Sequence, residues 1–336
     1  MTQTYDIAIV GATGLVGEAF IELLQKRQFP IGKLYLLASE RSAGRQIQFG
    51  ETYLKVKNLT DFDFSKTQMA FFSAGSKVSA EYAPKAAAAG CIVIDNTSQF
   101  RYHADIPLII PEVNPQDLES FRETNIIANP NCSTIQMLVA LKPIYDQAGI
   151  THIEVATYQA VSGAGRKAMD ELAKQTADLL NGHGAEAKEF LKQIAFNVLP
   201  QIGDFQDNGF SLEEMKMVKE TRKILDDPSI IVNPTAVRVP VFFGHSEAVH
   251  IQTQREITPE EVICLLKEAP GICVVEDQDY PTAFTDAANE DQVFVGRIRQ
   301  AIDNPLGLNL WIVADNVRKG AALNAIQIAE LLIEQY

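Results

Sequence analysis

Short apolar runs recur through the first 131 residues, and this pattern restricts the possible fold more than any other feature. The runs are continuous rather than alternating, and helical patterns such as "GLVGEAFIELLQKR" lie between the early ones. A strand that is apolar on both sides is covered on both faces, as in a parallel sheet with helices on each side. We therefore expect an α/β fold with a doubly wound parallel sheet. Its strands are predicted in "DIAIV", "KLYLLA", "MAFFSA", "CIVID", "LIIPEV" and "NIIAN".

The pattern changes after residue 150, where the apolar segments become longer. "QVFVGRIRQAI" and "GLNLWIVADN" flank the turn-forming "DNPLG", which predicts an antiparallel hairpin. Two helical patterns, at 166–180 and 212–226, interrupt these strands, and the segment at 181–211 between them has weak periodicity. This half of the chain is thus predicted to form an α+β domain with a largely antiparallel sheet.

The chain of 336 residues is long for a single core, which favours two domains. In its last segment Ala322, Ile326, Ala329 and Ile333 fall on one helical face, and such a face needs a sheet to cover. We expect this helix to return to the first sheet. The predicted domains are 1–131 together with 317–336, and 132–316.

Composition excludes several classes of partner. With 29 basic and 43 acidic residues the formal net charge is -14, which disfavours binding to nucleic acid or to an anionic membrane. No apolar run approaches the roughly 20 residues that cross a bilayer, and the start of the chain resembles no signal peptide. Four scattered cysteines, without a CxxC pair, indicate thiols rather than disulfides or a metal site. A cytoplasmic protein is expected.

A glycine-rich loop joins the first predicted strand to the first predicted helix. "VGATGLVG" places Gly11, Gly14 and Gly17 there, where a tight turn lets the backbone approach a pyrophosphate. The amide hydrogens at the helix start would face that anion. The spacing is GxxGxxG rather than GxGxxG, so a packing turn without a ligand remains an alternative. The context nevertheless favours a Rossmann-like dinucleotide site.

The end of the second predicted strand bears on which dinucleotide binds. In "LLASERSAGR" the side chains of Ser39, Arg41 and Ser42 offer hydrogen-bond donors, which suit the 2′-phosphate of NADP. Glu40 would instead suit the ribose hydroxyls of NAD, and a solvated Arg41 is also possible. NADP is the predicted cofactor.

Cys132, in "NPNCST", precedes the apolar periodic segment "IQMLVALKPIY". A thiol attacks as the thiolate, which the amides and dipole at a helix N-terminus stabilise. Ser133 or Thr134 could cap this helix. The cysteine is a candidate nucleophile, but a buried structural thiol is equally consistent with this segment alone.

The motifs together resemble one family. "NPNCST", "QAVSGAG", "EEMK", "RVPV" and "GHSEAV" follow the glycine loop in an order that is similar to aspartate-β-semialdehyde dehydrogenases. The resemblance extends to the terminal "DNVRKGAALNAIQIAE" and so covers nearly the whole chain. It implies a homodimeric enzyme whose second domain is the catalytic and dimerisation domain.

The resemblance also implies a reaction. The family reduces L-4-aspartyl phosphate to L-aspartate 4-semialdehyde and phosphate with NADPH, reversibly, on the route to lysine and diaminopimelate, threonine, methionine and isoleucine. Cys132 would form an acyl-thioester, which divides one difficult step into two. His245 in "GHSEAV" matches the acid/base group, and histidine suits proton transfer near neutral pH. Gln159 matches the residue that positions the substrate near the thiol.

The substrate is an anion with a carboxylate and a phosphate. Arg238 interrupts an apolar strand and its planar guanidinium suits a carboxylate. Glu213 matches the family acid that holds the substrate amino group. For phosphate the resemblance implies Arg101, Asn131 and Lys216, although a solvated charged helix could also explain Glu213 and Lys216.

The cofactor contacts implied by the resemblance come from both domains. They are Gly11, Thr13, Gly14, Leu15 and Val16 in the loop, Ser39, Arg41 and Ser42 after the second strand, Gly75, Ser162, Gly163 and Asn316.

Three alternatives remain open from the sequence. Another acyl-phosphate reductase of this architecture, such as N-acetyl-γ-glutamyl-phosphate reductase or glyceraldehyde-phosphate dehydrogenase, would carry a different sequence around the cysteine. A non-catalytic NADP-binding protein would not require Cys132, Gln159, Arg238 and His245 together. The third alternative is an inert Cys132 in a core.

Overall fold

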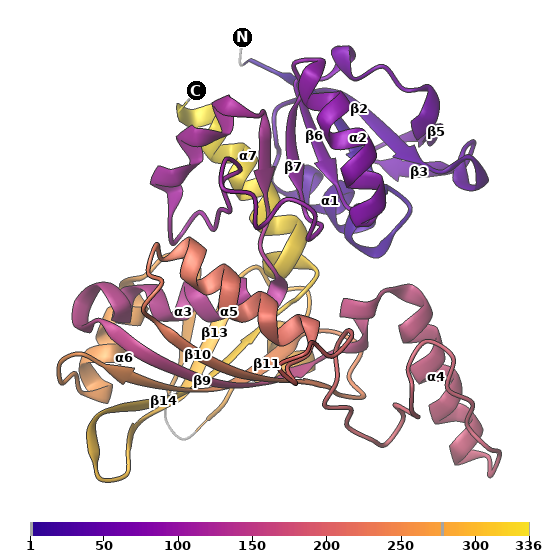
Figure 1. Ribbon diagram of the computed structural model, residues 1–336. Helices are drawn as coiled ribbons and strands as arrows, with labels where there is room; N and C mark the ends of the chain where they lie inside the picture. The colour runs from indigo at the N-terminus through magenta and orange to yellow at the C-terminus, as the bar shows by residue number, and fades with distance from the viewer. Residues whose placement is uncertain (1–2, 277–278, 336) are drawn as a thin grey trace. The chain divides into compact units, whose positions relative to one another are not determined.

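The structure is a computed structural model that describes residues 3–276 and 279–335. The described chain divides into two compact units, drawn in Figure 1. The first runs to Asn131 and resumes at Ala321, and the second is Cys132–Gly320. We expected the second boundary after Asn316, whereas it falls after Gly320.

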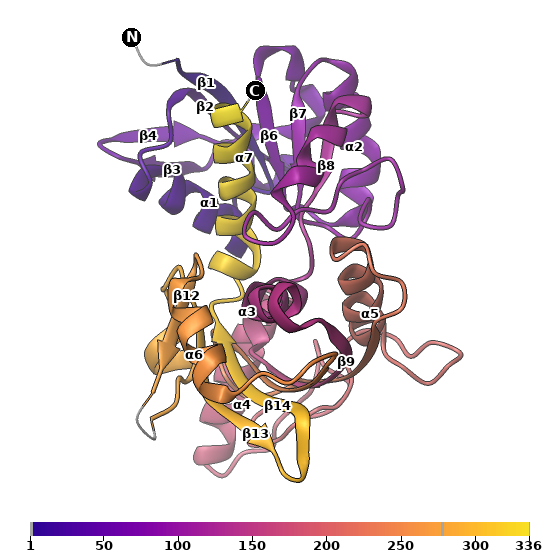
Figure 2. The same cartoon turned by 90° about the vertical axis from the view of Figure 1, so that its left-hand side faces the viewer.

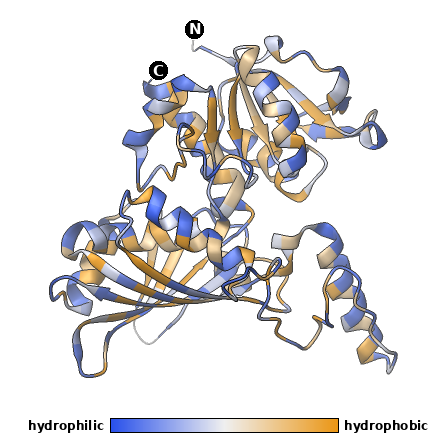
Figure 3. Cartoon of the chain, viewed as in Figure 1, coloured by the Kyte–Doolittle hydropathy of each residue, from blue (hydrophilic) through white to orange (hydrophobic). Residues whose placement is uncertain are grey.

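The first unit contains the predicted parallel sheet, which confirms the fold class. Its strand order is β5-β2-β1-β6-β7-β8, and every pair is parallel. β6 is buried along its whole length, and Figure 3 shows the central strands as mostly hydrophobic. The strands are β1 Tyr5–Val10, β2 Ile31–Ala38, β5 Lys57–Asn58, β6 Met69–Phe72, β7 Ile92–Asp95 and β8 Ile126–Ala128, with a separate hairpin of β3 Gln46–Phe49 and β4 Thr52–Lys55.

Three helices cover this sheet. α1 (Leu15–Lys26) and α7 (Leu323–Gln335) pack together on one face, and α2 (Ser76–Ala88) lies on the other (Figure 2). Ile326 and Ala329 of α7 are fully buried in the same core cluster as Ile7 and Phe71 of the sheet. The terminal helix therefore completes the core of the first unit.

The run "LIIPEV" was predicted as a strand, and this prediction is wrong. Residues 108–110 and Val113 are buried, but the run forms only an isolated bridge, between Leu108 and Ala128, and the sixth strand is the short β5. Pro111 lacks the amide hydrogen that a strand ladder needs. The side chain of Asn114 supplies part of the missing pairing, because it accepts from the Ile110 amide at 2.9 Å and donates to the Leu108 carbonyl at 3.0 Å.

The second unit is built on a mixed sheet in the order β10-β9-β11-β14-β13-β12. The three central pairs are antiparallel, as predicted, whereas both outer pairs are parallel. The predicted hairpin is present, but its turn is shorter than "DNPLG", because β14 already begins at Asn304. The strands are β9 Ile150–Gln159, β10 Ile231–Arg238, β11 His245–Thr253, β12 Ile272–Val275, β13 Val293–Ala301 and β14 Asn304–Ala314.

Helices of the second unit cover one face of this sheet. α3 (Cys132–Ala148) contacts β9, β11, β13 and β14, while α5 (Leu212–Ile224) and α6 (Pro259–Glu268) flank it. Figure 1 shows α3 and α5 along this face. α4 (Arg166–Leu180) and α5 confirm the two helices predicted in this half. Among the described residues, no helix combines the length and apolar character needed to cross a membrane.

The segment 181–211 contains no helix or named strand. Part of it closes a small apolar cluster with α4, in which Leu172, Ile194 and Ala195 are buried. Leu191 and Phe196 are instead exposed.

Candidate active site

Cys132 is the first residue of α3 and is partly buried. Its position at the helix N-terminus, which the sequence predicted, favours the thiolate. Ser133 and Thr134 lie inside the helix and are buried, so neither occupies the capping position before it. The electrostatic field at the thiol is also favourable, because Arg238 and the Cys132 thiolate attract each other.

Three predicted site residues stand side by side at the ends of neighbouring strands. Gln159 ends β9, and it pairs with Arg238 at the end of β10 and with His245 at the start of β11. Directly opposed residues of a sheet project from the same face. The register of three strands therefore places an amide, a guanidinium and an imidazole together, and all three are buried.

The peptide groups of Ala160 hold two of these side chains. Its amide donates to Nδ1 of His245 at 3.1 Å, and its carbonyl accepts from a terminal nitrogen of Arg238 at 2.7 Å. Nε2 of His245 has no hydrogen-bond partner among the described residues. Because Nδ1 accepts a hydrogen bond, the neutral imidazole carries its proton on Nε2, which can donate to a substrate.

Burial controls the charge of this cluster. The pKa of His245 is lowered to about 3, first by complete burial and then by the positive charge of Arg238. The imidazole is thus neutral at neutral pH. Burial also lowers the pKa of Arg238, while Glu213 and Cys132 oppose that shift. A buried guanidinium of this kind is ready to pair with an anionic ligand.

Gln159 connects the strand ends to the two helices. Its Nε2 donates to Oγ of Ser133 on α3 at 2.9 Å and approaches Oε1 of Glu213 at 3.4 Å. Glu213 lies in the first turn of α5, where its other oxygen accepts from Nζ of Lys216 at 2.8 Å. Ser211 caps α5 through a capping box with Glu214, which fixes where this turn begins. Glu213 and Lys216 are thus an ion pair beside the cluster rather than a solvated helix face.

Two glycines border the cluster where a side chain would not fit. A Cβ at Gly163 would lie 2.9 Å from the Arg238 guanidinium and 3.2 Å from Nε2 of His245. A Cβ at Gly320 would lie 2.8 Å from the Cβ of Cys132. The family resemblance implies that Gly163 contacts the cofactor, whereas Gly320 was not singled out. Only spatial proximity to Cys132 identifies the latter.

The predicted glycine loop of the first unit has the expected geometry. Gly11 has φ 94°, and a Cβ at Gly17 would lie 2.2 Å from the Gly11 carbonyl oxygen. Gly14 precedes α1 and provides no side-chain cap, so the loop with Thr13, Leu15 and Val16 presents the uncapped start of a helix. This combination of close packing and uncapped helix start fits a dinucleotide pyrophosphate.

The other predicted residues of the first unit lie at the ends of its strands. Ser39, Arg41 and Ser42 follow β2, with the Arg41 side chain exposed. Gly75 precedes α2 with φ 95°, a conformation that favours glycine. Arg101 follows β7 and is buried, donating to the Asn96 carbonyl at 2.9 Å.

Asn131 is buried immediately before Cys132, so chain connectivity places it beside the candidate nucleophile. In the second unit, Ser162 donates to Oδ1 of Asn316 at 3.1 Å, and the Gly244 amide donates to the same oxygen at 3.0 Å. Asn316 thereby anchors the residue before His245.

The second unit therefore assembles Cys132, Gln159, Glu213, Lys216, Arg238 and His245. A thiol at a helix start, a neutral imidazole and a guanidinium suit acyl transfer through a covalent intermediate to an anionic substrate. Among residues 3–276 and 279–335, no group of three or more His, Cys, Asp or Glu side chains could hold a metal ion.

Comparison with known proteins gives matches over both units. Residues 6–121 match the family model described as semialdehyde dehydrogenase, NAD binding domain, and residues 141–319 match semialdehyde dehydrogenase, dimerisation domain. Aspartate-semialdehyde dehydrogenase 2 of Vibrio cholerae is 59% identical over 100% of both chains.

Two solved structures extend this comparison. The crystal structure of aspartate semialdehyde dehydrogenase II from Vibrio cholerae, complexed with ASA, has a TM-score of 0.99 at 58% identity and 100% coverage of both chains. The aspartate semialdehyde dehydrogenase of Candida albicans, with NADP, has a TM-score of 0.77 at 26% identity, covering 98% of this chain and 99% of the other.

Proposed function

The chain belongs to the aspartate-semialdehyde dehydrogenase family, and on that premise we propose that it interconverts L-4-aspartyl phosphate and L-aspartate 4-semialdehyde through a thioester on Cys132. Two observations support the mechanism. Cys132 lies at the start of α3, and Gln159 pairs with Arg238 and with His245 on the two neighbouring strands. An enzyme of this family is an oxidoreductase. A non-catalytic binding protein would have no use for this set.

Each residue has one task in the proposed reaction. The Cys132 thiolate attacks the acyl carbon, phosphate leaves, and a thioester forms. NADPH, when bound, supplies the hydride that reduces this thioester. The oxyanion that results accepts a hydrogen bond from Nε2–H of His245 and collapses to the aldehyde and the Cys132 thiolate, while Gln159 orients the reacting group beside the sulfur.

The charges of the site suit the substrate. Arg238 binds the substrate carboxylate with two parallel hydrogen bonds, and Glu213 accepts from the amino group. We assign the phosphate to Lys216, Arg101 and Asn131. The buried guanidinium of Arg238 supports its assignment to the substrate carboxylate, because burial without an anion would be costly.

Phosphate-dependent formation of NADPH from aspartate semialdehyde tests this function. We expect turnover with NADP and phosphate, none without phosphate, and none after alkylation of thiols. N-acetylglutamate semialdehyde is the alternative substrate. If the enzyme turned it over faster than aspartate semialdehyde, the proposed substrate would be wrong. In the opposite direction the product is this aldehyde, and we propose that it supplies the routes to diaminopimelate and lysine, threonine, methionine and isoleucine.

The proposed cofactor is NADP, with Arg41 and Ser42 on its 2′-phosphate and Ser39 nearby. The exposed Arg41 after β2 supports this proposal. Gly11, Thr13, Gly14, Leu15 and Val16 would hold the pyrophosphate, while Gly75, Ser162, Gly163 and Asn316 would border the rest of the cofactor.

Arg41→Ala should reduce the preference for NADP over NAD by about tenfold or more, because one charge-assisted contact to phosphate is lost. The ratio of kcat/KM for the two cofactors measures this. Arg45→Ala, at an exposed position nearby, is the matched control and should leave the ratio unchanged. An unaltered ratio in Arg41→Ala would assign the 2′-phosphate to other residues.

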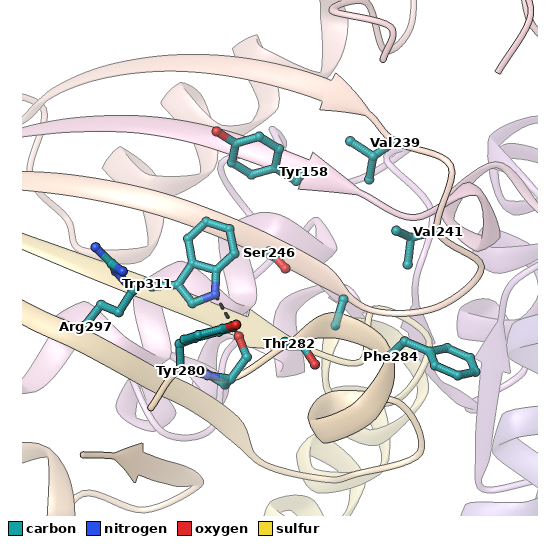
Figure 4. Close-up of a pocket in the computed structure, with 11 residues that line it drawn as sticks. Tyr158, Val239, Val241, Ser246, Tyr280, Thr282, Phe284, Arg297 and Trp311 are labelled. Carbon is teal, nitrogen blue, oxygen red and sulfur yellow. Dashed lines mark hydrogen bonds between the residues drawn. The ribbon is translucent and has the colours of Figure 1, made fainter. Parts of the chain in front are cut away.

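We further propose a homodimer formed through the second unit. The sheet face opposite α3 carries a cavity of about 620 Å³ lined by Tyr158, Val241, Phe284 and Trp311 (Figure 4), and Phe284 is 64% exposed. The match to a dimerisation domain covers this face. A second copy of the chain is therefore the proposed occupant.

Sedimentation equilibrium should give twice the mass of the chain, and Phe284→Asp should shift the equilibrium toward monomer because it places a charge in the proposed interface. Tyr53→Asp, an exposed aromatic position in the first unit, is the control. A wild-type monomer would contradict the dimer. A cytoplasmic location is proposed from the free thiols, and cell fractionation would test it.

A further inference from the structure

Glu247 is a buried acid in the second unit that has no part in the proposed chemistry. It lies two residues after His245 on β11, so both side chains project from the same face of the sheet. It is 0% exposed. Thr157 and Ile312 lie opposite it on the neighbouring strands, and Ser133 and Gln136 face it from α3. None of these neighbours is charged.

The surroundings of Glu247 favour its neutral carboxyl form. Burial raises its pKa well above the ordinary value, and the opposing effects of Gln136 and Ser133 are smaller. Ser133 and Gln136 are the hydrogen-bonding side chains that reach its oxygens, and no other described residue bonds to them. A carboxylate in such a place would exchange its hydration for two neutral hydrogen bonds at most, so burial favours the protonated carboxyl group.

Neighbours of Glu247 also hold the site residues. Ser133 accepts from Nε2 of Gln159 at 2.9 Å, and Oγ1 of Thr157 accepts from the same nitrogen at 3.3 Å. Nε2 of Gln136 donates to the backbone carbonyl of His245 at 3.3 Å. Glu247 therefore neighbours three side chains that hold Gln159 and His245, and one of them, Ser133, follows Cys132 in α3.

We propose that Glu247 is a positioning residue that works as an uncharged hydrogen-bonding group. Its carboxyl oxygen accepts a hydrogen bond from the Ser133 hydroxyl. This orients the lone pairs of Ser133 toward Nε2 of Gln159, which keeps the Gln159 carboxamide beside the thiol. No proton is transferred in this role. The inference rests on the proposed function in one respect, namely that Gln159 orients the substrate.

Two substitutions separate this role from a catalytic or purely structural one. Glu247→Gln keeps the size, the neutrality and an accepting oxygen, so kcat should stay within about threefold of the wild-type value. Glu247→Leu keeps the volume but removes the acceptor, so kcat should fall about tenfold or more. The affinity for NADP should be unchanged in both, which shows that both proteins fold.

The activities alone can overturn the proposal. If Glu247→Gln loses as much activity as Glu247→Leu, the acid itself takes part in the chemistry. If Glu247→Leu is fully active, the carboxyl group positions nothing.

Infrared spectroscopy tests the neutral state without any substrate. The wild-type spectrum minus that of Glu247→Gln at pH 8 should contain the carbonyl band of a protonated carboxyl group. A difference that shows carboxylate bands instead would overturn the proposal. Should the wild-type enzyme fail to turn over aspartate semialdehyde, the proposed function is wrong, and this spectrum still decides the state of Glu247.

The dependence of stability on pH gives an independent check. A raised pKa in the folded protein means that the contribution of Glu247 to stability is complete below its unfolded pKa of about 4.3 and declines as pH rises toward its folded value. Glutamine does not titrate. The Tm of Glu247→Gln relative to wild type should therefore increase from pH 5 to pH 8, and a constant difference would contradict the buried neutral acid.

Discussion

Replacing Cys132 by serine should reduce the phosphate-dependent oxidation of aspartate semialdehyde by at least about 10³-fold. A serine hydroxyl stays protonated where a thiol at a helix start ionises, and a reaction that needs a covalent intermediate then loses its first step. The helix N-terminus and the neutral His245 assist the reaction of the sulfur, but neither can form the covalent intermediate in its place.

The expected effect is in kcat, since the residues that bind the substrate remain. Single-turnover measurements with aspartate semialdehyde and NADP would show it directly. Cys264→Ser is the matched control, because Cys264 is exposed on α6 and away from the cluster. Substantial activity in Cys132→Ser, with NADP binding intact, would remove Cys132 as the nucleophile.

Replacing Arg238 by lysine should raise the KM for aspartate semialdehyde by about 10- to 100-fold. A point charge on a flexible stem does not reproduce the two parallel hydrogen bonds of a guanidinium to a carboxylate, and charged hydrogen bonds contribute about 1.5–3 kcal/mol each. Lysine would also lose the contact from Arg238 to the Ala160 carbonyl. The affinity for NADP should not change.

Steady-state kinetics with the aldehyde as varied substrate checks this prediction. Arg255→Lys, at an exposed position after β11, is the control for general effects of the substitution. An unchanged KM in Arg238→Lys would mean that another cation, such as Lys216, binds the substrate carboxylate.

Continuous apolar runs were sufficient to predict the parallel sheet, because strands buried on both faces leave a plain signal in sequence. The same signal failed for "LIIPEV", in which the apolar side chains are buried but Pro111 interrupts the run and the Asn114 side chain bonds to its backbone. Hydrophobicity reports burial, and pairing depends on the amide hydrogens. Prolines were therefore the better guide at that point.

The site residues could be proposed from motifs, but their relations could not. That Gln159 pairs with both Arg238 and His245 depends on strand register, which no local pattern specifies. Glu247 was visible as an acid two residues beyond His245 in an apolar strand, and strand alternation would have placed it on the same face. Gly320 gave no signal, because its proximity to Cys132 joins segments nearly two hundred positions apart.

The Ala160 peptide groups have a consequence for anyone who wishes to redesign the specificity. One residue contributes its amide to His245 and its carbonyl to Arg238. A backbone adjustment that moves Arg238 to admit a longer acid would also turn the imidazole. Selectivity and turnover would then change together, and laboratory evolution toward a new aldehyde should accumulate compensating changes around residue 160 before it recovers speed.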